Sequence, residues 1–162
     1  MTPARKVMPT RRAIVFAVAA GALAPIGRAA TAPALLVRDA IVTPTRGLSS
    51  VNAAYLTIVN PTRAPDRLVG AEMAGAERVE IHMHDMADGM MRMRRVDDGV
   101  AIPAKAKVVF GPGGLHLMAF GVARGLTYGE DVALTLQFER AGRLPVKAIC
   151  ATAVATSHGA HR

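Results

Sequence analysis

Hydrophobic and polar residues alternate in short runs along most of the chain beyond residue 34. The clearest run is 131–138, in which Val132, Leu134, Leu136 and Phe138 occupy every second position. Successive side chains of a strand point to opposite faces of a sheet, so this alternation is typical of a strand with one buried face. No segment after the first thirty residues keeps the period of an amphipathic helix. The pattern therefore predicts an all-β domain.

Other runs of the same kind predict further strands. They cover residues 35–42, 53–59, 67–71, 78–84, 90–96, 105–110, 115–120 and 144–149. Turn-forming pairs such as Asn60-Pro61, Asp88-Gly89 and Asp98-Gly99 separate neighbouring runs. Short strands with turns at this spacing favour a Greek-key β-sandwich or barrel. We expect seven to nine strands, no internal repeat and no second domain.

The first thirty residues follow a different pattern. A basic opening with Arg5, Lys6, Arg11 and Arg12 precedes an apolar run over 13–23 and a stretch of small residues. This order is typical of a secretory signal peptide. The apolar run is shorter than the roughly 20 residues that span a bilayer, which makes an uncleaved membrane anchor the less favoured alternative.

The cleavage site of this leader sets the expected domain boundaries. Cleavage after Ala29 is preferred, because Pro33 would directly follow the alternative site after Ala32. We expect a signal peptide over 1–29, a β-domain over 30–149 and a flexible tail over 150–162 that carries His158 and His161. The expected location is the periplasm, with no membrane span left after cleavage. A twin-arginine route remains open beside the general secretory route, because Arg11 and Arg12 are adjacent.

The net charge of the chain changes when the leader is removed. The whole chain has 20 Lys and Arg against 12 Asp and Glu, a formal charge of +8. Five of the basic residues lie in the leader and no acidic residue precedes Asp39, which leaves a net +3. Aromatic residues make up 4% and Trp is absent, so stacking platforms for bases are scarce. A nucleic-acid partner is therefore not expected.

Cys150 is the only cysteine. A single cysteine excludes an internal disulfide and every multi-cysteine metal site. An electron-transfer copper site needs a thiolate, two histidines and an axial ligand such as Met. After Cys150 the chain has His158 and His161 but no methionine, so this class stays a less favoured alternative. The role of Cys150 itself remains open.

The methionines are unevenly distributed. Of the nine, two lie in the leader, six fall between Met73 and Met93, and one is Met118. Methionine in a protein core is usually a scattered gap filler, so this clustering suggests another purpose. The alternative is that these methionines simply pack the core, and that the chain is a metal-free exported β-domain that serves as an interaction module.

The densest part of the cluster, residues 82–93, reads as a β-hairpin. In such a hairpin His82 or His84 can approach Met93 or Met91. His84, Met83, Met86 and Met90 could add a second metal, could form a transfer relay, or could have no such role.

Another pair of candidate ligands lies farther along the chain. His116 and Met118 are two residues apart in a predicted strand, which places both on one face. Thioether sulfur is a soft, neutral ligand that suits Cu(I), whereas hard cations such as Mg²⁺ prefer oxygen. Two histidines and two methionines would hold Cu(I) without adding ligand charge. No GxSxG, HExxH, CxxC or P-loop pattern occurs, and an enzyme is not expected.

These residues resemble the signature of the periplasmic copper chaperone family PCuAC. The match consists of His82, ten intervening residues, Met93, and then His116-x-Met118. The flanking text is also similar over about 35–149, including Val79-Glu80-Ile81-His82, Met91-Arg92-Met93-Arg94 and Pro112-Gly113-Gly114-Leu115.

The resemblance implies a cupredoxin-like β-sandwich that holds Cu(I) through His82, Met93, His116 and Met118. It further implies delivery of copper to the cytochrome c oxidase subunit that carries the binuclear copper site, in some cases alongside a thiol-based chaperone. A monomer is expected. Members can carry a His- or Met-containing tail with a Cu(II) role, and His158 and His161 match such a tail only in part because it lacks methionine.

Overall fold

The computed structural model describes residues 35–45, 50–87 and 89–153. The predicted leader and most of the predicted tail lie outside these residues. The described residues form ten strands and no helix, and so none of them forms a helix long and apolar enough to cross a membrane. The strands are β1 (Leu36–Val42), β2 (Asn52–Val59), β3 (Asp66–Met73), β4 (Arg78–Ala87), β5 (Met90–Arg95), β6 (Val100–Ile102), β7 (Lys107–Phe110), β8 (Leu115–Phe120), β9 (Asp131–Phe138) and β10 (Gly142–Cys150).

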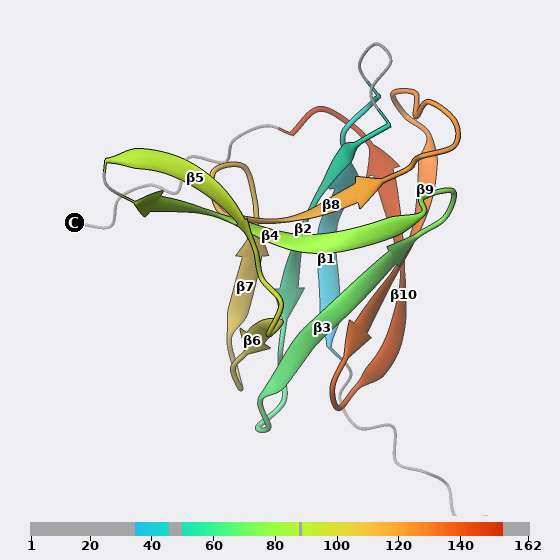
Figure 1. Ribbon diagram of the computed structural model, residues 1–162. Helices are drawn as coiled ribbons and strands as arrows, with labels where there is room; N and C mark the ends of the chain where they lie inside the picture. Colours follow the sequence, from blue (N-terminus) through green and yellow to red (C-terminus); the bar gives the residue numbers. More distant parts are fainter. Residues whose placement is uncertain (1–34, 46–49, 88, 154–162) are drawn as a thin grey trace, which may run out of the picture. The chain divides into compact units, whose positions relative to one another are not determined.

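The strands form one continuously hydrogen-bonded sheet in the order β5-β4-β8-β2-β1-β10-β9-β3-β6, with β7 also paired to β2 (Figure 1). Neighbouring strands are antiparallel except β1 and β10, which are parallel. This architecture confirms the all-β, cupredoxin-like prediction. The strand number exceeds the predicted seven to nine, because β6 has only three residues and is too short to show alternation.

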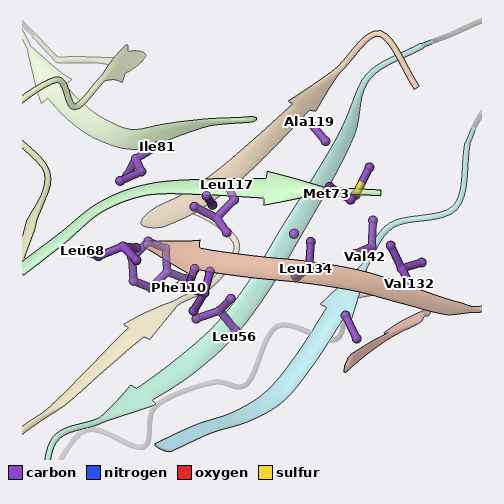
Figure 2. Packing of buried hydrophobic residues seen from close by; sticks show 14 of the residues in the cluster. Val42, Leu56, Leu68, Met73, Ile81, Phe110, Leu117, Ala119, Val132 and Leu134 are labelled. Carbon is purple, nitrogen blue, oxygen red and sulfur yellow. The ribbon is translucent and has the colours of Figure 1, made fainter. Parts of the chain in front are cut away.

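One hydrophobic core is lined by strands from both halves of this order. Figure 2 shows Leu68 of β3, Leu56 of β2, Leu117 of β8 and Leu134 of β9 gathered in it. Each of these four side chains is at most 2% exposed. Met73 is also buried there, at 5% exposure, so for this one member of the methionine cluster the core-packing explanation holds.

The residues of β4 and β8 that are buried in the core show which of their neighbours project from the opposite face of the sheet. Ile81 of β4 lies opposite Leu117 of β8, and Ala54 of β2 lies on the other side of Leu117. All three are buried in the core. Because side chains alternate along a strand, the residues on either side of them in sequence project from the opposite face. That face carries the predicted ligands.

Candidate metal centre

Strand register brings three of the four predicted ligands into one neighbourhood. β4 lies between β8 on one side and β5 on the other. His82 of β4 is directly opposite His116 of β8, and His84 of β4 is directly opposite Met93 of β5. Directly opposite residues of an antiparallel pair share a face, so all four side chains lie on the face away from the core.

His116 is the most enclosed member of the group, at 3% exposure. Its Nδ1 atom is 2.9 Å from the carbonyl oxygen of Gly114, and its Nε2 atom is 3.1 Å from the Sδ atom of Met93. A carbonyl only accepts hydrogen bonds, so Nδ1 carries the proton and the lone pair of Nε2 faces the thioether sulfur. A nitrogen donor and a sulfur donor therefore lie side by side.

Burial lowers the pKa of His116 below the usual value of histidine. The carbonyl of Gly114 opposes this shift, while the nearby His84 and His82 reinforce it. The neutral ring is the form that binds metal ions. The environment thus favours the ligand form of His116.

His82 is oriented by a carboxylate on its own strand. Its Nε2 atom is 2.9 Å from Oε2 of Glu80, which a protonated Nε2 can donate to. The Nδ1 atom of His82 is buried and has no hydrogen-bond partner. The ring centroid lies 5.9 Å from that of His116. An unpartnered nitrogen near another imidazole is consistent with a position that a metal ion would satisfy.

Glu80 is itself held in place by two arginines. Its Oε1 atom accepts hydrogen bonds from Arg78 at 3.0 Å and from Arg95 at 3.3 Å. The hydrogen bonds with His82 and then with Arg78 lower the pKa of Glu80. Sequence reasoning gave Glu80 no role, although its spacing of two residues from His82 on a strand places both side chains on one face.

His84 stacks directly on His116. Their ring centroids are 4.9 Å apart and the rings are 24° from parallel. The backbone N–H of His84 donates to the carbonyl of Gly114 at 3.2 Å, and its Nδ1 atom is buried without a hydrogen-bond partner. Sequence reasoning left open whether His82 or His84 approaches Met93, and the register places His84 opposite it.

Met118 lies farther along the same face. It is two residues beyond His116 in β8, directly opposite Glu80 of β4 and Ala53 of β2, and half-buried. His116 makes direct contacts with Met93 and with the rings of His82 and His84. Met118 is assigned to the site because its position in β8 puts it on the same face. Over the described ranges, no three His, Cys, Asp or Glu residues gather into a group that could hold a metal. The predicted ligands on this face offer ring nitrogen from His82 and His116 and thioether sulfur from Met93 and Met118.

Cys150 lies away from this face. It ends β10 opposite Val42 of β1, and its side chain is fully buried in the core. Burial, and then the charge of Glu130, raise the pKa of the Cys150 thiol. Cys150 is also the first residue of the predicted tail, and the structure places it within the last strand.

A known protein family and several solved structures are similar to this chain. The family model described as "LpqE-like: Putative lipoprotein LpqE-like" matches residues 35–149. The structure titled "Solution structure of CuI-DR1885" from Deinococcus radiodurans is 30% identical, covers 75% of this chain and 80% of its own, and has a TM-score of 0.60. The "Copper-bound PCuAC domain from PmoF2" is 23% identical, covers 72% of this chain and 91% of its own, and shares the fold with a TM-score of 0.61.

Curated relatives match over shorter stretches. "Putative lipoprotein Lxx21020" of Leifsonia xyli subsp. xyli is 29% identical over 98 residues, which are 60% of this chain and 59% of that protein. "Uncharacterized protein RP573" of Rickettsia prowazekii is 28% identical over 94 residues, which are 58% of this chain and 52% of that protein. The match thus spans less than two thirds of either relative.

Proposed function

Because the chain belongs to the LpqE-like family, which is the PCuAC family, we propose that it is an exported copper chaperone that carries one Cu(I) ion. The observation that carries this proposal is the contact between Nε2 of His116 and Sδ of Met93. It sets a borderline and a soft donor beside each other on a face that has no thiolate, and Cu(I) accepts both donors.

The proposed ligands are Nδ1 of His82, Sδ of Met93, Nε2 of His116 and Sδ of Met118. The unpartnered Nδ1 atom of His82 supports this set, because a bound ion would satisfy it. All four donors are neutral, so Cu(I) would keep its charge and the site would favour a monovalent ion over a divalent one.

The unequal exposure of the ligands suggests how the ion leaves. Met93 is 50% exposed on the edge strand β5, whereas His116 is 3% exposed between β4 and β2. A thiolate from a partner can therefore reach the ion from the Met93 side and replace that thioether first. The protein would act by ligand exchange, with no acid, base or covalent intermediate.

The proposed destination rests on the resemblance to the PCuAC family alone. We propose that the chain works in the periplasm as a monomer and passes copper toward the subunit of cytochrome c oxidase with the binuclear copper site. A thiol-based chaperone would assist this transfer. The names of the relatives that contain the word lipoprotein support an exported protein.

Titration of the reduced protein with Cu(I) against a competing chelator tests the proposal. One equivalent should bind tightly enough to compete with the chelator, and His116→Ala or Met93→Leu should weaken this binding by at least about tenfold. The matched control is Met90→Leu, because Met90 is 58% exposed on the same hairpin but projects from its other face. Binding that both site variants leave unchanged would overturn the ligand set, and no binding at all would favour a metal-free interaction domain.

A further inference from the structure

We propose that Met86 and Met91, together with His84, form a second, outer site for a soft monovalent metal ion. It would lie beside the candidate metal centre, two residues farther along the β4–β5 hairpin toward its turn. The inference rests on the proposed function, because the ion would be the same cargo.

The register of the hairpin aligns the donors. Met86 is directly opposite Met91, and His84 is directly opposite Met93. Met86 and His84 are two residues apart on β4, so both pairs project from the same face, about 7 Å apart along the strand. Directly opposite side chains have Cβ atoms about 5 Å apart, which lets two thioethers converge on one ion.

Core packing does not account for this methionine pair. Met86 and Met91 are each 64% exposed, in contrast to Met73, which is buried in the core. The hairpin extends past the neighbouring strands at one side of the sheet (Figure 1). Two flexible apolar side chains facing each other in solvent gain little from burial, and their sulfur atoms are accessible to an ion.

His84 supplies the third donor. Its Nδ1 atom is buried and has no hydrogen-bond partner, while its ring stacks on that of His116. His84 therefore lies between the outer methionine pair and the inner histidine. Two thioethers and an imidazole are three neutral donors that suit Cu(I) or Ag(I) and not Ca²⁺ or Mg²⁺. Because its sulfur ligands are more exposed, the outer site should bind more weakly than the inner one.

The chain provides an internal control for this inference. Met90 is adjacent to Met91 and 58% exposed, but it pairs with Ala87 and so projects from the opposite face of the hairpin. It offers a thioether of similar accessibility without the partner donors. Nonspecific binding by exposed sulfur would affect Met90 as well, whereas a built site would not.

Titration of the full chain with Ag(I), followed by NMR of ¹³C-labelled methionine methyl groups, tests the proposal. The first equivalent should shift the signals of Met93 and Met118, and the second should shift those of Met86 and Met91 and leave Met90 unmoved. The double variant Met86→Leu/Met91→Leu should lose the second event and keep the first, and Met90→Leu should keep both.

Absence of a second event, or an equal shift at Met90, would overturn the outer site. Shifts at Met86 and Met91 without any shift at Met93 and Met118 would support the outer site and overturn the inner ligand set. The two sites are thus read from separate signals, so failure of one cannot be mistaken for failure of the other.

Discussion

The Nε2 atom of His116 lies 3.1 Å from the Sδ atom of Met93, across a separation of 23 residues in sequence. Met93 lies on the edge strand β5, and His116 on β8, with β4 between them. The contact therefore depends on both ladders of β4. A change that disturbs either ladder would separate the donors without replacing a ligand.

Replacing Glu80 should weaken copper binding although Glu80 is not a proposed ligand. In Glu80→Ala the Nε2 atom of His82 loses its acceptor, so the ring no longer favours the form with a free Nδ1 lone pair. Loss of such an orienting partner typically costs about 10–100-fold in metal affinity. Chelator competition measures the affinity, and ¹⁵N NMR of the histidine rings reports the tautomer.

Glu80→Gln serves as the control for this prediction, because its amide oxygen can still accept from His82. It should retain most of the affinity and the tautomer. An Ala variant that binds copper as tightly as the parent would show that Glu80 does not orient the site.

Asn60 should be needed for stability. It is 1% exposed, and its Nδ2 atom donates to the carbonyls of Ala64 at 2.9 Å and Ile102 at 3.2 Å. Its Oδ1 atom accepts from both N and Oγ1 of Thr62. Asn60→Ala removes all four of these hydrogen bonds at a buried position, and the free energy of unfolding should fall by about 1–3 kcal/mol. Urea denaturation measures the change, and a variant as stable as the parent would contradict the structural role.

Cys150 should be inert while the domain is folded. Its thiol is fully buried and burial raises its pKa, so the reactive thiolate is scarce. Alkylation by iodoacetamide at neutral pH should be slow for the folded protein and fast in denaturant. Cys150→Ala should leave Cu(I) affinity unchanged, because the side chain is on the core side of the sheet. Loss of Cu(I) binding in that variant would instead place the thiol among the ligands.

The pair of Glu72 and Arg143 should make stability depend on acid pH. Arg143 Nη1 and Nη2 donate to the two carboxylate oxygens at 2.8 and 2.6 Å, across the intervening β9. Hydrogen bonding from Arg143 is the main cause that lowers the pKa of Glu72. A lowered folded-state pKa means that the stabilisation is present above the ordinary glutamate range and is lost as pH falls through the folded value.

Thermal denaturation of the parent and of Glu72→Gln at several pH values measures this effect. The parent should be the more stable of the two at neutral pH, and the difference should disappear in acid. The pair is exposed, so salt should reduce the difference as well. A difference that is constant with pH would indicate that the charge of Glu72 is not its source.

Much of the fold could be predicted from the sequence because most strands have one buried face. The alternation over 131–138 reappears as β9, and the other eight predicted runs correspond to observed strands. β6 could not be predicted, because three residues cannot display a period.

The candidate site was predictable in composition but not in register. The i, i+2 spacing of His116 and Met118 placed both on one face, which the structure matches. Which histidine of the hairpin lies opposite Met93 depends on the number of residues in the turn, and His82 and His84 are two residues apart and share a face, so alternation does not distinguish them. The sequence pattern could not decide this, and the register places His84 there and Arg95 opposite His82.

The parallel pairing of β1 and β10 has a consequence for the order of folding. Val42 lies opposite Cys150, so β1, the first strand among the described residues, pairs with β10, the last of them. Closing so long a segment costs entropy that no local contact offsets, and such pairings form slowly. Synthesis from the N-terminus therefore leaves β1 with one open edge until the final strand is made. The β1–β10 pairing should therefore form late in folding, and a chain truncated before β10 should not fold.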